Sequence, residues 1–261
     1  MKAMRGLGLS AEDLARRVEL PMRVVQFLLA GDYEEGAARI VARQLYLNHD
    51  CLHELATCPK RANCQLPDCI QRHNSPFPVP GYEEMTVNSY SVQPGKDGEV
   101  GLLFDAGSRF KSVYDTKISR IHSDWHLFLT HTDPDHVVMF NELAEVVAHS
   151  HTPVDEPYGK ALPVKAGDVY ALGKLQITAL QTVGHSPGGT SYLLEGAGRP
   201  IAFVGDALFC YSIGKVRADY KSALAQIRSN LLSLPGETIL CPGHGPITTV
   251  EFERNHNPFF A

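Results

Sequence analysis

Four separated loops of the sequence carry histidines and aspartates of the kind that bind metal ions. The first is HTDPDH, residues 131–136, with two histidines and two aspartates in six positions. The others are VGHSPGG around His185, VGDALF around Asp206 and PGHGP around His244, each with a glycine before the polar residue. Every loop follows an apolar run typical of a buried strand, and glycine allows a tight turn there. Because neutral imidazole and carboxylate groups bind zinc, iron and manganese, the loops together predict a metal site.

The elements that would position these loops follow residue 85. The expected strands cover 86–92, 100–104, 125–130, 146–149, 167–183, 190–195, 201–204 and 238–241. The expected helices cover 110–121, 137–145 and 219–233, with a last short helix after them. Strands mixed with single helices and long antiparallel stretches predict a layered α/β domain with helices outside.

These motifs resemble those of the metallo-β-lactamase superfamily, and the C-terminal part is similar to glyoxalase II and its short hydrolase relatives. FVGDALF, SIGK and PGHGPITTVEFERNHNPF carry this similarity, which covers residues 85–261. It implies an αββα sandwich with a dinuclear metal centre. By motif, one metal would be bound by His131, Asp133 and His185, the other by Asp135, His136 and His244, with Asp206 bridging. Asp105 in LLFDAG would not bind metal itself but would support one of the ligands by contacting it.

Asp133 departs from the pattern of this superfamily, which has a second histidine at that position. Aspartate can also bind a metal, and the flavodiiron branch of the superfamily uses glutamate there. Three carboxylates and a bridging hydroxide would carry four negative charges, which balances two divalent cations. Because an oxygen-richer ligand set favours harder ions, iron and manganese become rivals of zinc. The other hypothesis is a decayed site that the chain keeps for its fold.

The resemblance implies a hydrolase that cleaves a small thioester or ester with two divalent metal ions. Asp135 would orient the attacking water, or act as general base if only one metal is present. Tyr211 and Lys215 follow the Asp206 loop and are candidate substrate contacts. The alternative for both is a surface loop.

A second group of potential ligands lies earlier in the chain, where Cys51, Cys58, Cys64 and Cys69 fall within a stretch of 19 residues. In a reducing compartment, four such thiols favour a bound zinc ion or an iron–sulfur cluster. Redox-active thiols and unligated cysteines are the alternatives. Together with Asp133, these cysteines support a second hypothesis of function, a di-iron redox or oxygen-responsive protein with a regulatory helical module.

The first 57 residues have the pattern of several short helices. Ser10 and Asp13 have the spacing of a capping box, which predicts a helix start. Pro21 suits the first turn of the next helix and Gly31 its end. A further helix is expected over 34–47, and CLHELA forms a fourth.

This succession of helices resembles the helix-turn-helix domain of Cro-like phage repressors. The candidate recognition helix, PMRVVQFLLAG, offers only Arg23 and Gln26 as base readers. Reading DNA requires basic groups for phosphate and polar groups for base edges. We therefore expect a docking module, or one that forms a homodimer, rather than a DNA-binding domain.

Charge and composition set the remaining limits. The net charge is −5, and residues 1–75 hold 10 Lys and Arg against 9 Asp and Glu, which leaves 14 against 20 for the rest. Neither balance predicts binding to nucleic acid or an anionic membrane. The proline-rich segment HNSPFPVPGYEE suggests three parts: helices over 1–57, a cysteine-rich segment and linker over 58–84, and the metal-binding domain over 85–261. No signal peptide or membrane-spanning stretch is recognisable, so a cytoplasmic location is expected.

Overall fold

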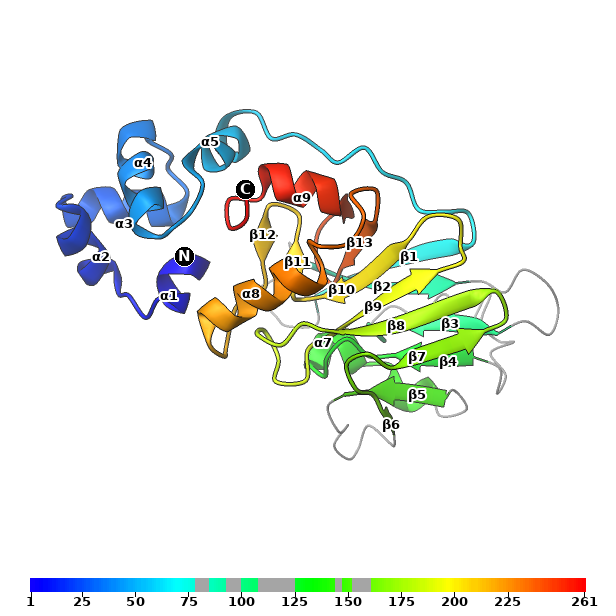
Figure 1. Ribbon diagram of the computed structural model, residues 1–261. Coiled ribbons are helices and arrows are strands. Elements are labelled where there is room, and N and C mark those ends of the chain that lie inside the picture. Colours follow the sequence, from blue (N-terminus) through cyan, green and yellow to red (C-terminus); the bar gives the residue numbers. More distant parts are fainter. Residues whose placement is uncertain (78–84, 93–99, 108–124, 144–146, 152–160) are drawn as a thin grey trace.

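The chain forms two facing β-sheets with helices on both outer sides and a group of short helices at its N-terminal end (Figure 1). The computed structural model describes residues 1–77, 85–92, 100–107, 125–143, 147–151 and 161–261. The helix expected over 110–121 and most of the proline-rich segment lie outside the described residues.

The first sheet has the strand order β1-β2-β3-β4-β5-β6. Its strands are β1 Ile70–Pro76, β2 Thr86–Val92, β3 Gly101–Phe104, β4 Trp125–Phe128, β5 Val147–Ser150 and β6 Leu162–Pro163. Strands β1, β2 and β3 pair antiparallel, whereas β3, β4, β5 and β6 pair parallel. β1 was not expected, because its sequence IQRHNSP has no apolar alternation; it lies in the segment interpreted as a linker, so the sheet begins before residue 85.

The second sheet has the strand order β14-β13-β10-β9-β8-β7. Its strands are β7 Val169–Leu172, β8 Leu175–Gln181, β9 Thr190–Glu195, β10 Ile201–Gly205, β13 Ile239–Pro242 and β14 Thr248–Thr249. Only the β10–β13 pair is parallel among these described pairings. A small hairpin, β11 Leu208–Phe209 and β12 Ser212–Ile213, follows β10.

Side chains alternate between the two faces of each strand, which fills the space between the sheets and the space outside them. In β3, Leu102 and Phe104 enter the core between the sheets, where the Phe104 ring stacks on Phe203 of the second sheet. Leu103 belongs to a separate cluster with Val137 on the outer side of the first sheet. This arrangement confirms the predicted α/β sandwich.

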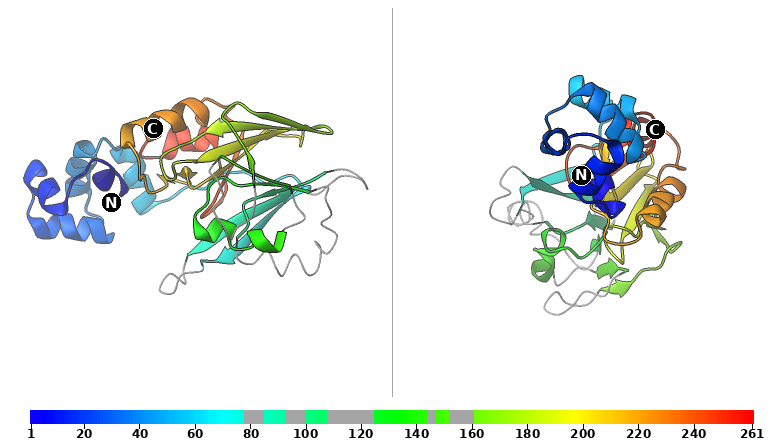
Figure 2. Two further views of the ribbon diagram at one scale, coloured as in Figure 1. Left: turned by 90° about the horizontal axis from the view of Figure 1, so that it is seen from below. Right: turned by 90° about the vertical axis from the view of Figure 1, so that its left-hand side faces the viewer.

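Helices cover the outer faces of both sheets, as Figure 2 shows from two further directions. Helices α8, Tyr220–Asn230, and α9, Val250–His256, lie over the second sheet, and α7, Pro134–Val137, lies outside the first. The α-helix predicted over 137–145 is wrong for the described residues, because α7 ends at Val137 and a short 3-10 helix, η2 Phe140–Leu143, follows it. Pro134 occupies the first turn of α7, where its fixed φ and missing N–H are tolerated, so the helix begins within the HTDPDH motif.

Five short helices precede the sheets: α1 Lys2–Gly6, α2 Ala11–Val18, α3 Met22–Ala30, α4 Glu35–Gln44 and α5 His49–Thr57. The capping box is confirmed, because Asp13 N donates to Ser10 Oγ and Ser10 N donates to the Asp13 carboxylate. Gly31 ends α3 with a φ of 106°, as expected for a glycine cap. In the described part of the chain, no helix has the length and apolar character needed to cross a membrane.

The N-terminal helices pack directly onto the second sheet and α8. Met4 and Leu14 belong to the same buried cluster as Val204 of β10 and Ile227 of α8. At Gly6 a Cβ atom would lie 2.2 Å from the Tyr220 ring, which shows how closely α1 approaches α8. The helices and the outer face of the second sheet therefore share one hydrophobic core.

Candidate metal centre

The four loops meet at one edge of the sandwich. HTDPDH leaves the first sheet after β4, and α7 turns its last two polar residues inward. His185 lies on the loop between β8 and β9, whereas Asp206 and His244 follow the parallel strands β10 and β13. The carboxyl ends of neighbouring parallel strands lie at the same edge, which explains why residues so distant in sequence come together.

All four histidines are held by their outer ring nitrogen, Nδ1. The contacts are His131 Nδ1 to Thr130 Oγ1 at 3.0 Å, His136 Nδ1 to Asp105 Oδ2 at 2.9 Å, His185 Nδ1 to the Lys215 carbonyl at 3.0 Å and His244 Nδ1 to the Thr86 carbonyl at 2.7 Å. In a neutral ring, an Nδ1–H that donates in this way leaves the inner nitrogen Nε2 with a free lone pair for a metal ion. The hydrogen bonds therefore turn four potential ligand atoms toward one point.

The inner atoms have the spacing of ligands around a metal ion. Asp135 Oδ2 lies 3.4 Å from both His136 Nε2 and His244 Nε2. Asp206 Oδ1 lies 3.5 Å from His136 Nε2. Asp206 Oδ2 lies 3.5 Å from His185 Nε2 and 3.4 Å from His244 Nε2. Bonds of about 2.0–2.1 Å in a tetrahedral site place ligand atoms about 3.3 Å apart. Two sets of three potential ligands result: His131, His185 and Asp206, and Asp135, His136 and His244. A third set, Asp105, His131 and His136, shares a histidine with each of them, and the predicted ligand Asp133 belongs to none of the three.

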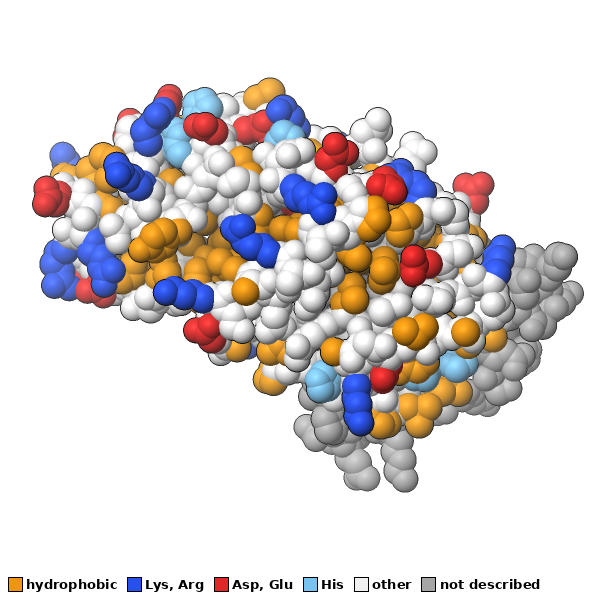
Figure 3. Space-filling view, viewed as in Figure 1, with side chains coloured by type: hydrophobic (Ala, Val, Ile, Leu, Met, Phe, Trp, Pro, Cys, Tyr) orange, Lys and Arg blue, Asp and Glu red, His pale blue; other side chains and the backbone are white. Residues whose placement is uncertain are grey.

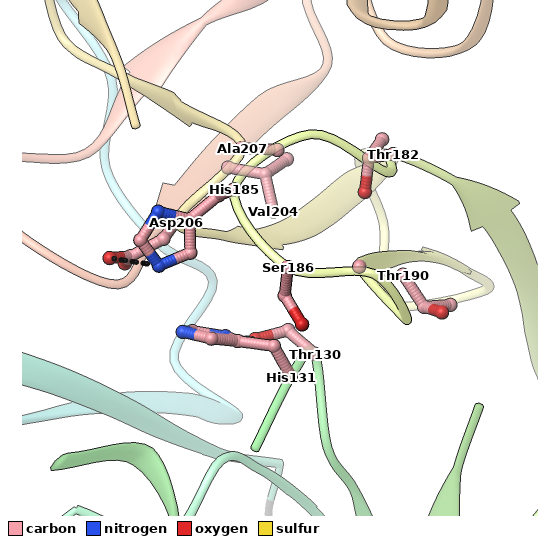
Figure 4. Close-up of a pocket in the computed structure, with 10 residues that line it drawn as sticks. Thr130, His131, Thr182, His185, Ser186, Thr190, Val204, Asp206 and Ala207 are labelled. Atoms are coloured by element: carbon pink, nitrogen blue, oxygen red, sulfur yellow. Dashed lines mark hydrogen bonds and ion pairs between the residues drawn. The ribbon is translucent and has the colours of Figure 1, made fainter. Parts of the chain in front are cut away.

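Unpaired polar atoms support the same interpretation. His131 Nε2, His136 Nε2 and Asp206 Oδ1 are buried and have no hydrogen-bond partner among the described residues. A buried polar atom without a partner is costly, and metal ligation would satisfy all three. The residues present therefore fit a metal centre. Figure 4 shows His131, His185 and Asp206 together at a small pocket that is also lined by Thr130 and Ser186.

Asp105 holds the HTDPDH loop from outside the ligand set. Its Oδ1 accepts from Thr130 N at 2.7 Å, and its Oδ2 accepts from Thr130 Oγ1 at 2.8 Å and from His136 Nδ1. Thr130 Oγ1 in turn accepts from His131 Nδ1. One buried carboxylate thus orients two histidines, which agrees with the supporting role expected for Asp105.

The electrostatic environment differs among the histidines. Burial lowers the pKa of His131 to about 4. Burial also disfavours the charged form of His136, but Asp105 and Asp206 outweigh it and raise its pKa well above the ordinary value. For His244, the carboxylates of Asp135 and Asp206 likewise overcome burial and raise the pKa to about 9. Without a metal ion, protons on histidine therefore neutralise the carboxylates.

The carboxylate of Asp133 accepts hydrogen bonds from Arg217, a residue that was not predicted from the sequence. Asp133 Oδ2 lies 3.1 Å from His185 Nε2 and 4.0 Å from His131 Nε2, which places it beside the first ligand set. Arg217 donates to both oxygens of this carboxylate. Burial would raise the pKa of Asp133, but the bonds from His185 and Arg217 lower it below the ordinary value. No local sequence motif predicts the role of Arg217, because 84 residues separate it from Asp133.

The two candidate substrate contacts occupy different surroundings. Tyr211 is buried, and its hydroxyl donates to Glu54 and accepts from the Lys60 amide, so its described contacts join the N-terminal helices to the β12 hairpin. The exposed Lys215 contributes its carbonyl to His185. Substrate contact for either side chain remains a prediction without a described contact behind it.

The four cysteines near α5 do not gather in the described structure. Cys51 is buried and its thiol faces the Asn255 carbonyl, Cys58 is exposed, and Cys64 and Cys69 pack against the core between the sheets. Among the described residues, no cysteine belongs to a group with metal-ligand spacing. The predicted zinc or iron–sulfur cluster is therefore not preformed there.

Comparisons with known proteins agree with the fold and the site. No protein-family model matches the chain. A probable metallo-hydrolase of Streptococcus pyogenes is 29% identical over 61% of this chain and 80% of its own length. The hydroxyacylglutathione hydrolase GloC of Haemophilus influenzae is 34% identical over 36% of this chain and 44% of its own. For most of these curated relatives, the match spans half of their length or less.

Solved structures show the same architecture. The BLEG-1 B3 metallo-β-lactamase is 25% identical, with a TM-score of 0.61 over 73% of this chain and 100% of that one. A structure of TTHA1623 in a di-iron-bound form is 28% identical, with a TM-score of 0.55 over 67% of this chain and 95% of that one. By fold, the chain matches solved metallo-β-lactamase structures, and the curated proteins that it resembles include a probable metallo-hydrolase and hydroxyacylglutathione hydrolases.

Proposed function

We propose that the protein is a metal-dependent hydrolase with two divalent metal ions that cleaves a small thioester or ester. The observation that carries this proposal is the set of four histidines whose outer nitrogens are bound and whose inner nitrogens face Asp135 and Asp206 at ligand spacing. In such a site, bound divalent cations lower the pKa of water and polarise a substrate carbonyl oxygen.

The residues of the chain would supply orientation and proton transfer. Asp135 is largely buried between His136 and His244, so its carboxylate has few other positions to adopt. From there it would accept a hydrogen bond from the attacking water and fix its direction. Ser186 lines the neighbouring pocket and would offer its hydroxyl group there, whereas the Thr130 hydroxyl is already used by Asp105 and His131.

The substrate class rests on the relatives. Several of them are named hydroxyacylglutathione hydrolases, and one is named a probable metallo-hydrolase without a stated substrate. Because these alignments leave parts of the hydrolases uncovered, we propose a thioester or ester in general rather than a glutathione thioester. The di-iron-bound neighbour makes iron a candidate metal beside zinc and manganese.

A substrate panel tests this proposal. Protein stripped with a chelator and reloaded with zinc, manganese or iron is assayed against thioesters, esters, lactones and phosphodiesters. We expect thioester or ester hydrolysis that disappears with chelator and in a His136→Ala variant. Lack of activity in all three metal-loaded forms against the whole panel would overturn the proposal.

A further inference from the structure

Asp133 and Arg217 form a paired unit at the metal centre. Arg217 Nη1 donates to Asp133 Oδ1 at 2.9 Å and Arg217 Nη2 to Oδ2 at 2.7 Å, the two-bond geometry typical of arginine and carboxylate. The side chains are partly exposed, at 46% for Arg217 and 23% for Asp133. Because both oxygens are used, the guanidinium offsets the full charge of this carboxylate.

The backbone holds Arg217 in place beside the ligands. Arg217 N donates to the Gly184 carbonyl at 2.8 Å, and Ala218 N donates to the same carbonyl at 3.2 Å. Gly184 immediately precedes His185, and Lys215 provides the carbonyl that orients that histidine. The segment between β12 and α8 thus fixes the His185 loop and presents the arginine to Asp133.

We propose that Asp133 and Arg217 together act as one neutral ligand unit, equivalent in charge to a histidine at position 133. This inference rests on the proposed metal centre. Asp133 Oδ2 lies 3.1 Å from His185 Nε2, within the spacing of ligands around one ion, while the same oxygen also accepts from Arg217. The ligand atom is an oxygen, but the net charge of the Asp133–Arg217 pair is zero, like that of a neutral imidazole.

The consequence concerns the charge of the whole cluster. Counting Asp133 alone, three carboxylates would make the ligand set unusually anionic and favour hard cations. With Arg217 included, one of these charges is cancelled. Asp133 by itself then gives no reason to expect harder ions than a site with histidine at this position.

A double-mutant cycle tests the proposal through metal affinity rather than activity. Apo-protein is titrated with zinc and separately with manganese, in the wild type, R217Q, D133H and D133H/R217Q. We expect R217Q, which leaves an uncompensated carboxylate, to bind both ions about tenfold more tightly, and D133H, which leaves an uncompensated guanidinium, to bind both about tenfold more weakly. The double variant should lie within about threefold of the wild type.

Controls separate this effect from other causes. Lys221→Gln makes the same charge change on an exposed position of α8, four residues after Arg217, and should leave both affinities within about twofold. Thermal unfolding of each variant checks that the fold is kept. The proposal is overturned if R217Q binds like the wild type or more weakly, or if D133H and the double variant bind alike. A wild type that takes up no metal overturns the proposed function as well, whereas an inactive protein that binds metal leaves the cycle measurable.

Discussion

Each of the four histidines of the candidate site has a hydrogen-bond partner at its outer nitrogen, Nδ1. Lys215 and Thr86 use main-chain carbonyls to hold Nδ1 of His185 and His244, so these two hydrogen bonds depend on backbone position. Asp105 orients His136 through its side chain, so this hydrogen bond can be removed by a point mutation.

Metal uptake should release protons at neutral pH. The pKa of His244 is raised to about 9 by Asp135 and Asp206 despite burial, so the metal-free ring carries a proton at pH 7. A metal must displace this proton, and apparent affinity should therefore rise as pH increases toward about 9. Calorimetric titration of zinc in two buffers with different ionisation enthalpies measures the protons released. Equal heats in both buffers and a flat affinity between pH 6 and 8 would contradict the prediction.

Asp105→Asn should weaken metal binding about 10- to 100-fold, since outer partners of metal ligands typically contribute this much. The amide keeps the size of the side chain but removes the charge that His136 and Thr130 share. Competition with a metal-binding dye measures the affinity. Asp168→Asn, the same change at a turn where the carboxylate accepts from Lys165 N, is the matched control. Equal affinities of the two variants would refute the assigned role of Asp105.

At the level of elements, glycines allow the loops to approach one another closely. At Gly243 an added Cβ atom would lie 2.4 Å from Asp206 Oδ1 and 2.5 Å from His136 Cε1. Gly243→Ala should therefore displace these side chains and abolish binding of at least one metal, with little loss of secondary structure. Elemental analysis and circular dichroism measure both. Gly236→Ala, where the nearest side-chain atom would be 3.3 Å away, should retain full metal content.

The sequence predicted the elements whose patterns are local and missed those that depend on distant partners. Buried strands such as β10 are recognisable from an unbroken apolar run, and the loops after them carry their own histidine or aspartate. β1 has no such pattern, because it is formed by pairing with β2 along its whole length. The role of Arg217 was not predicted for the same reason, since its partner Asp133 is distant in sequence.

At the level of the whole molecule, the N-terminal helices pack against the α/β sandwich and share a hydrophobic core with it. Leu14 is fully buried in the cluster that includes residues of β10 and α8. Leu14→Ala should cost about 2–5 kcal/mol of unfolding free energy and lower the denaturation midpoint of the entire chain. Denaturant unfolding followed by both tryptophan fluorescence and circular dichroism checks this, since Trp125 lies in the first sheet. Separate melting of the helices, with Trp125 unaffected, would contradict this expectation.

The helical surface gives limited support to DNA binding. In the face shown in Figure 3, basic and acidic side chains are interspersed over the N-terminal helices. Phe27 and Ile40 are exposed on α3 and α4, which suits the proposed docking role or homodimer better than phosphate contact. Both the helix-turn-helix assignment and the homodimer remain predictions.

We expect the four loops to form a working metal centre. Elemental analysis with an absorption spectrum of anaerobically purified protein tests it most directly, because it counts metal ions per chain and distinguishes iron from zinc. We predict two metal ions per chain, reduced in His131→Ala and His136→Ala variants that still fold. Protein that carries no metal and takes none up from zinc, manganese or iron solutions would contradict a metal centre at these loops.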